Sequence, residues 1–324
     1  MAEKADFKRF EEFQVPVAGG ELAVLRWPAR ERDAPVVVAA HGITANALAW
    51  AGVSEALAGR VTLVAPDMRG RAYSRAISGP FGVDADADDL IAVLDHEGAD
   101  KAVLLGHSLG AYVASVAATR YPERVSSVVA ADGGLGLGVP PDVDPDEILL
   151  AILGPALQKL SMRFRDGEDY LDFHRRHPAF RGNWTPQLTA YLSRDTLWLE
   201  DGGVASSCIA EAIRADGREL VIDERIRTAI LGVPCPLTFL YAERNLFNEP
   251  PGIYTPELIA LGGLDDRPDR RITITFVPGT NHYTMVAPGA GADAVADAVL
   301  RSALAEPAAA PGVAAPFLTR RYPA

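Results

Sequence analysis

Residues 101–120 constrain the fold more than any other part of the chain, because they combine a strand, a tight glycine-flanked turn and a helix in that order. Residues 101–105 are an apolar run that predicts a buried strand, and residues 111–120 carry small and apolar side chains at helical spacing. Side chains at Gly106 and Gly110 would collide with the adjoining helix and strand, and so tight a turn forces the backbone of Ser108 into a strained region. The pattern predicts a reactive serine hydroxyl exposed at the end of a strand.

The first half of the chain alternates strand and helix signals. An opening antiparallel hairpin is followed by βαβ units, which imply a doubly wound, mostly parallel α/β sheet with helices on both faces. The predicted strands cover residues 13–17, 21–27, 36–40, 61–65, 101–105 and 125–131, and a predicted helix covers residues 86–96.

The alternation of strand and helix signals ends after residue 134. Helical periodicity without a convincing strand then predicts helices over residues 148–160, 170–177, 186–198 and 206–215. The sheet resumes at residues 237–242 and 272–277, before a last helix over residues 292–304. We therefore expect a discontinuous core of residues 1–134 and 231–305, with a helical cap, residues 135–230, inserted after the sixth strand. Residues 306–324 are an Ala/Pro-rich tail with little to bury, expected to be extended or poorly ordered.

Composition and charge exclude several classes of protein. A net charge of −12 argues against binding to nucleic acid or to anionic membrane surfaces. Two cysteines, Cys208 and Cys235, fit no metal-site spacing and form no disulfide framework. The charged N-terminus lacks the apolar segment of a signal peptide, and we find no run of about 18 apolar residues. These features favour a cytoplasmic protein without a metal site, and they leave its oligomeric state open.

Four separated motifs resemble those of the α/β-hydrolase family, and the resemblance extends from Val36 to Leu304. Each motif follows a predicted strand, and together they are specific in order and spacing. They are His41-Gly42-Ile43, Asp67-Met68-Arg69-Gly70-Arg71, the turn from Gly106 to Gly110, and Gly279-Thr280-Asn281-His282.

The resemblance implies a role for several of these residues. Ser108 would be the nucleophile and His282, in the loop after the last strand, the base that takes its proton. The backbone amides of Ile43 and Leu109 would form an oxyanion hole for the charge that develops during attack. No metal or organic cofactor is implied.

The carboxylate partner of the histidine is less well defined. Many relatives carry an aspartate after the seventh strand, where this chain has Glu243 followed by asparagine at position 245. Other relatives place the acid after the sixth strand, where this chain has Asp132, and that choice also keeps the order Ser, Asp, His. We favour Asp132, with Glu243 as the alternative; Asp265, Asp266 or no acid at all also stay open.

These features predict a serine hydrolase that acts on a small-molecule carboxylic ester or lactone through an acyl-serine intermediate. A C–C bond hydrolase, a thioesterase or a perhydrolase would carry the same catalytic residues, and a ligand-sensing protein could retain them. Trp50 and Trp184 are candidates for contact with the substrate, although Trp50 could equally pack in the core.

Overall fold

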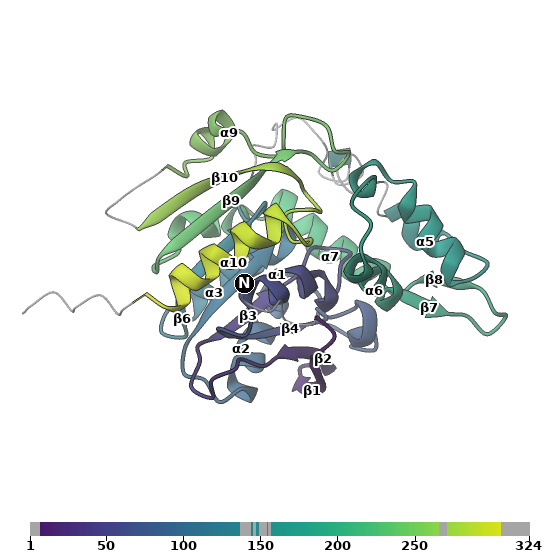
Figure 1. The fold of residues 1–324 in the computed structure, drawn as a ribbon, viewed down its shortest axis with the longest axis horizontal. Coiled ribbons are helices and arrows are strands. Elements are labelled where there is room, and N and C mark those ends of the chain that lie inside the picture. The colour runs from purple at the N-terminus through teal and green to yellow at the C-terminus, as the bar shows by residue number, and fades with distance from the viewer. Residues whose placement is uncertain are drawn as a thin grey trace, which may run out of the picture.

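An eight-stranded sheet forms the centre of the structure (Figure 1). The structure is a computed structural model that describes residues 7–136, 144, 147, 148, 154, 157–265 and 271–305. Its strand order is β1-β2-β4-β3-β5-β6-β9-β10. The strands are β1 (Glu11–Val17), β2 (Gly20–Trp27), β3 (Val36–Ala40), β4 (Thr62–Pro66), β5 (Ala102–His107), β6 (Val125–Ala131), β9 (Leu237–Arg244) and β10 (Ile272–Asn281).

The sheet is parallel from β4 to β10. Two pairs are antiparallel, β1 with β2 and β2 with β4. The central strands β3 to β6 are almost entirely buried, as expected for strands covered on both faces. The doubly wound, mostly parallel α/β sheet expected from the sequence is confirmed.

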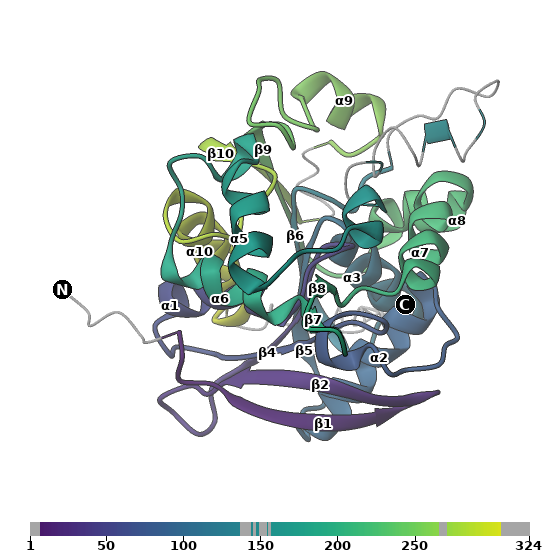
Figure 2. The same cartoon turned by 90° about the vertical axis from the view of Figure 1, so that its right-hand side faces the viewer.

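Helices cover both faces of the sheet (Figure 2). One apolar core contains the inner faces of α2 and α3, and the other contains those of α1 and α10. The helices are α1 (Ala51–Leu57), α2 (Val83–His96), α3 (Leu109–Arg120), α5 (Gly167–Arg175), α6 (Pro186–Arg194), α7 (Ala210–Ile222), α8 (Glu224–Thr228), α9 (Pro256–Leu261) and α10 (Ala290–Ala303). Short 3-10 helices are η1 (Ala47–Trp50), η2 (Ala72–Ser74), η3 (Pro178–Phe180) and η4 (Ala229–Gly232).

Residues 157–230, which we call the insertion, lie between β6 and β9 and contain α5 to α8. Its first part, with α5 and α6, extends beyond the core at the right of Figure 1. The prediction that it holds no strand is wrong, since β7 (Thr196–Trp198) pairs with β8 (Val204–Ser206). For this reason the helix predicted over residues 186–198 ends at Arg194, and the one predicted from residue 206 begins at Ala210.

Part of the predicted domain division lies outside the described residues. This applies to most of the helix predicted over residues 148–160 and to the tail, residues 306–324. The division into core, cap and tail therefore stays a prediction. Within the described part of the chain, no helix is long and apolar enough to cross a bilayer.

Buried polar contacts fasten the insertion to the loops of the core. Arg194 Nε lies 2.9 Å from an oxygen of Asp67, the residue after β4. Arg71 forms a buried ion pair with Asp216 of α7. Asn46 Nδ2 donates to the backbone oxygen of Tyr191 over 2.9 Å. These contacts fix α6 and α7 over the loops that follow β3 and β4.

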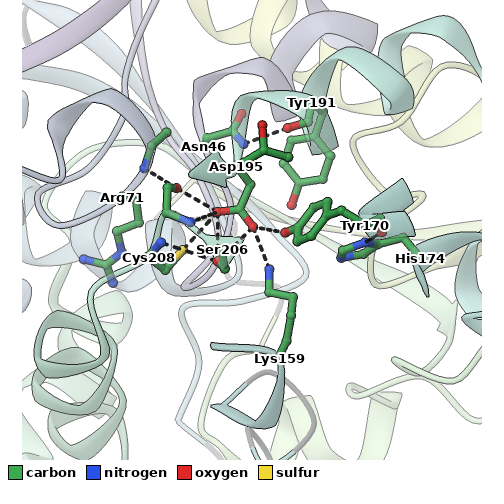
Figure 3. Close-up of polar contacts among 12 residues, drawn as sticks. Asn46, Arg71, Lys159, Tyr170, His174, Tyr191, Asp195, Ser206 and Cys208 are labelled. Atoms are coloured by element: carbon green, nitrogen blue, oxygen red, sulfur yellow. Dashed lines mark hydrogen bonds and ion pairs between the residues drawn. The ribbon is translucent and has the colours of Figure 1, made fainter. Parts of the chain in front are cut away.

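A second set of contacts holds the insertion together around the buried carboxylate of Asp195 (Figure 3). Lys159 Nζ donates to it over 2.8 Å, and the Tyr170 hydroxyl donates as well. Ser206 and Ser207 donate through their hydroxyls over 3.0 and 2.8 Å. We call these five residues the Asp195 cluster. It joins the end of α6 to α5 and β8.

Candidate active site

Ser108 occupies a strained turn between β5 and α3. Its backbone has φ 55° and ψ −121°, a region that side chains rarely adopt. A Cβ atom at Gly106 would lie 2.2 Å from the oxygen of Gly110, and one at Gly110 would lie 1.9 Å from the oxygen of Ala40. Only glycine fits at both positions, so the sequence Gly-x-Ser-x-Gly is what permits this turn.

Asp132 and His282 come together from the ends of two other strands. Asp132 follows β6, and its backbone also has a positive φ, 48°. Its Oδ1 accepts a hydrogen bond of 3.0 Å from the amide of Ala242, and its Oδ2 lies 2.7 Å from His282 Nδ1. Because a carboxylate only accepts, Nδ1 carries the proton and Nε2 of the neutral ring is left as an acceptor. The pair therefore presents a base with a defined tautomer.

His107 holds His282 in position through a hydrogen bond and a ring contact. Its Nε2 donates to the backbone oxygen of His282 over 2.8 Å, and the two ring centroids lie 4.7 Å apart. Burial, followed by the neighbouring His282, lowers the pKa of His107 to about 3, so this ring is neutral near pH 7. His107 acts here as a structural contact.

Ile43 and Leu109 both lie on the wall of the cavity that Ser108 lines. Leu109 is the first residue of α3, where backbone amides have no acceptor within the helix. The oxygen of Ile43 accepts a hydrogen bond of 3.0 Å from Arg71 Nε, which fixes the peptide that follows it. His41 binds this loop to the next one, since its Nε2 accepts from the amide of Met68 over 2.9 Å.

The cavity has a volume of about 490 Å³ and lies between the sheet edge and the insertion. Ser108, Asp132 and His282 line it, so the structure brings these three candidates to one site. Most of its wall is apolar, with side chains such as Leu48, Leu188, Leu220, Val221, Phe180, Phe247 and Val286. Among the described residues, no group of His, Cys, Asp and Glu side chains is placed to hold a metal ion.

Comparison with known proteins identifies the family of this chain. The family defined by the alpha/beta hydrolase fold matches residues 35–185. A 2-(acetamidomethylene)succinate hydrolase of Mesorhizobium japonicum is 36% identical over 257 residues, which are 77% of this chain and 82% of that protein. The chain belongs to the α/β hydrolase family.

Other likenesses are weaker in sequence identity or cover less of the chain. The crystal structure of an E-2-(acetamidomethylene)succinate hydrolase superposes with a TM-score of 0.72 at 24% identity, covering 90% of this chain and 98% of that one. A thioesterase domain from the curacin biosynthetic pathway gives 0.68 at 20% identity, covering 90% and 99%. These two establish the shared fold. An uncharacterised protein of Mycobacterium tuberculosis is 36% identical over 113 residues, 34% of this chain, and the chain matches only 31% of its length.

The alternative acid of this α/β hydrolase, Glu243, contacts a backbone amide. Glu243 Oε2 accepts a hydrogen bond of 2.7 Å from the amide of Gly279, and its side chain is 34% exposed. Asn245, which follows it, accepts from the amides of Phe247 and Glu249 and shapes the turn after β9. Asp266 lies outside the described residues. Asp132 is the carboxylate that His282 contacts.

Neither of the two tryptophans is among the described residues that line the cavity. Trp50 is fully buried against the face of the sheet that α1 and α10 cover, and it is absent from the described cavity wall. Trp184 is half-buried and also absent from that wall, with its Nε1 donating to Thr189 over 3.0 Å and Arg175 over its ring. Both pack within the protein. Sequence reasoning instead missed Tyr191 and Tyr283, which line the cavity but belong to no motif.

Proposed function

We propose that the protein is a serine hydrolase that cleaves a carboxylic ester or lactone of a small molecule through an acyl-Ser108 intermediate. The hydrogen bond of 2.7 Å between His282 Nδ1 and Asp132 Oδ2 carries this proposal. It orients a neutral imidazole whose other nitrogen can act as a base at the cavity that Ser108 lines. The hydrolase names of several relatives support the same class of reaction.

Acylation begins when Ser108 Oγ attacks the carbonyl carbon while His282 Nε2 takes the hydroxyl proton. The carbonyl oxygen becomes an oxyanion, which the amides of Leu109 and Ile43 would bind. In a serine hydrolase one such donor is worth about 3 kcal/mol of barrier. Asp132 stabilises the imidazolium that forms. The C–O bond then breaks, and His282 returns the proton to the departing alcohol.

Deacylation repeats these steps with water as the nucleophile. His282 removes a proton from water as its oxygen attacks the acyl carbon, and a second oxyanion forms in the same place. When this intermediate collapses, Ser108 recovers its proton and the carboxylic acid leaves. The proposed steps use only groups of this chain, the substrate and water.

Labelling with a fluorophosphonate tests the nucleophile. We expect the wild-type protein to be labelled and Ser108→Ala to show no labelling. Ser161→Ala changes an exposed serine and is the matched control, which we expect to label like the wild type. Equal labelling of Ser108→Ala would refute the proposal. Many turnovers of an activated ester per chain would separate an enzyme from a ligand-sensing protein, which would release product about once.

A second candidate reaction is hydrolysis of 2-(acetamidomethylene)succinate, favoured by the 36% identity to an enzyme of that name. The same serine, histidine and aspartate could attack this substrate. Turnover of this compound, measured beside a short ester and a short thioester under identical conditions, decides between the candidates. Faster turnover of the succinate compound would favour the second.

A further inference from the structure

The cavity offers no fixed positive charge to a substrate. Its described wall contains neither lysine nor arginine, and its one carboxylate, Asp132, is bonded to His282. Three buried cations of the insertion and the adjoining loops are already paired: Lys159 with Asp195, Arg194 with Asp67, and Arg71 with Asp216. Burial lowers the pKa of His177, another residue of the wall, and so favours its neutral form. A carboxylate bound here would lose its hydration without gaining a counter-charge.

Two neutral donors face the cavity instead. Tyr191 of α6 and Tyr283, next to His282, are half-buried on its wall, and no described group accepts a hydrogen bond from either hydroxyl. Burial raises the pKa of both phenols, so both keep their protons near neutral pH. Figure 3 shows Tyr191 beside the Asp195 cluster, which holds the end of α6 in place.

The other two tyrosines of the wall provide a contrast. Tyr112 and Tyr254 both donate to the backbone oxygen of Leu135 over 2.9 Å. Their hydroxyls are therefore satisfied within the protein. The Tyr191 and Tyr283 hydroxyls have no such acceptor among the described residues and are not fully buried, so both stay available to donate to an oxygen of a bound ligand.

We propose that the cavity selects uncharged, largely apolar ester substrates that carry a second neutral oxygen, such as a ketone, ether or hydroxyl, which accepts hydrogen bonds from Tyr191 and Tyr283. This proposal rests on the proposed function and narrows its substrate class. It predicts discrimination against substrates that end in a carboxylate, and therefore against 2-(acetamidomethylene)succinate, the second candidate substrate above.

Three 4-nitrophenyl esters of similar size test the proposal. The hexanoate ends in an ethyl group, the 5-oxohexanoate carries a neutral ketone, and the monoglutarate replaces the methyl group of that ketone by a carboxylate oxygen. We expect kcat/KM for the ketone to exceed that for the hexanoate about tenfold, as two neutral hydrogen bonds allow. We expect the carboxylate to fall about 100-fold below the ketone. A second series consists of acetate esters of three alcohols, whose chains end in an ethyl group, a ketone or a carboxylate. It is measured in parallel because the second oxygen can belong to the acyl part or to the alcohol part of the substrate.

Tyrosine-to-phenylalanine variants test which hydroxyls produce the preference for the ketone ester. Tyr191→Phe and Tyr283→Phe are each expected to reduce the ratio of kcat/KM for the ketone to kcat/KM for the hexanoate about threefold to fivefold. Tyr112→Phe and Tyr254→Phe are matched controls on the same wall and should keep the preference. A merely structural role of Tyr191 or Tyr283 would change both esters equally.

Two results would overturn the proposal: a carboxylate ester turned over as fast as the ketone ester in either series, or a ketone preference in both series that neither variant reduces. Absence of fluorophosphonate labelling at Ser108 would instead refute the proposed function. The two failures are therefore distinguishable.

Discussion

Asp132 at the sheet edge and Asp195 in the insertion are both buried carboxylates, with 1% and 4% of their surfaces exposed, but they are used differently. Asp132 accepts one backbone hydrogen bond and one from an imidazole that lines the cavity. Asp195 accepts from four side chains of its own cluster, including the ammonium of Lys159.

The difference separates a carboxylate to which we assign a role in the proposed reaction from one whose contacts stabilise the fold. Burial by itself raises the pKa of Asp195, but Lys159 and the donated hydrogen bonds together lower it, so the folded state favours its charged form. All of its partners lie inside the insertion, so the charge of Asp195 stabilises contacts within the insertion. Asp132 instead directs its charge toward His282, where the proposed mechanism needs it.

The largest expected effect concerns Asp132, which follows the carboxyl end of β6. Asp132→Asn should lower kcat for an activated ester about 10⁴-fold, because an amide cannot stabilise the imidazolium and favours the wrong tautomer. Glu243→Gln, which alters the partly exposed alternative acid, should change kcat less than about twofold. Steady-state kinetics of both variants provide the measurement. A greater loss in Glu243→Gln would assign the acid to the other residue.

A smaller effect is expected in the insertion. Asp195→Asn leaves the Lys159 ammonium buried without a counter-charge, and it should lower the free energy of unfolding by about 3 kcal/mol. Denaturant unfolding measures this loss. The double variant Asp195→Asn with Lys159→Met removes the orphaned charge and should be less destabilised than the single one. Asp172→Ala, in an exposed ion pair with Arg175, is the control and should cost less than about 1 kcal/mol. Equal losses of unfolding free energy in Asp195→Asn and in the control would contradict the stabilising role that we assign to Asp195.

The smallest effect concerns pH. Burial lowers the pKa of His174 to about 4, below the ordinary value of 6.5 that it regains on unfolding. The unfolded chain therefore binds the proton first, and stability present above pH 6.5 is lost as the pH falls toward 4. His174→Gln should reduce the pH dependence of the unfolding free energy by about 1.4 kcal/mol per pH unit in this window. Denaturant unfolding at several pH values tests it.

His96→Gln alters an exposed histidine and should leave that slope unchanged. If both variants kept the slope of the wild type, burial of His174 would not contribute to acid sensitivity. His41 and His107 at the sheet edge, whose pKa values are lowered to about 3, would then account for it.

The turn at Ser108 could be predicted because its determinants are local. Two glycines and the flanking strand and helix lie within twenty residues, and the collisions at Gly106 and Gly110 follow from backbone geometry alone. The parallel sheet could be predicted for a similar reason, since most residues of its buried strands are apolar.

The insertion was harder to predict because its structure depends on partners distant in sequence. Arg71 and Asp216 pair across 145 residues, and neither spacing nor periodicity indicates such a contact. The strands β7 and β8 are only three residues each, too short for an alternating pattern to be recognised. Tyr191 and Tyr283 look like ordinary core aromatics until the fold places them on one wall.

Arg71 gives this architecture a consequence for engineering. Its guanidinium donates through Nε to the backbone oxygen of Ile43 and pairs through Nη2 with Asp216 of α7. A chimera that exchanged residues 157–230 for those of another protein would have to supply a carboxylate at the same point, or the loop that carries the Ile43 peptide would lose its anchor. Exchanging the insertion alone is therefore not expected to transfer the substrate range of another protein to this one.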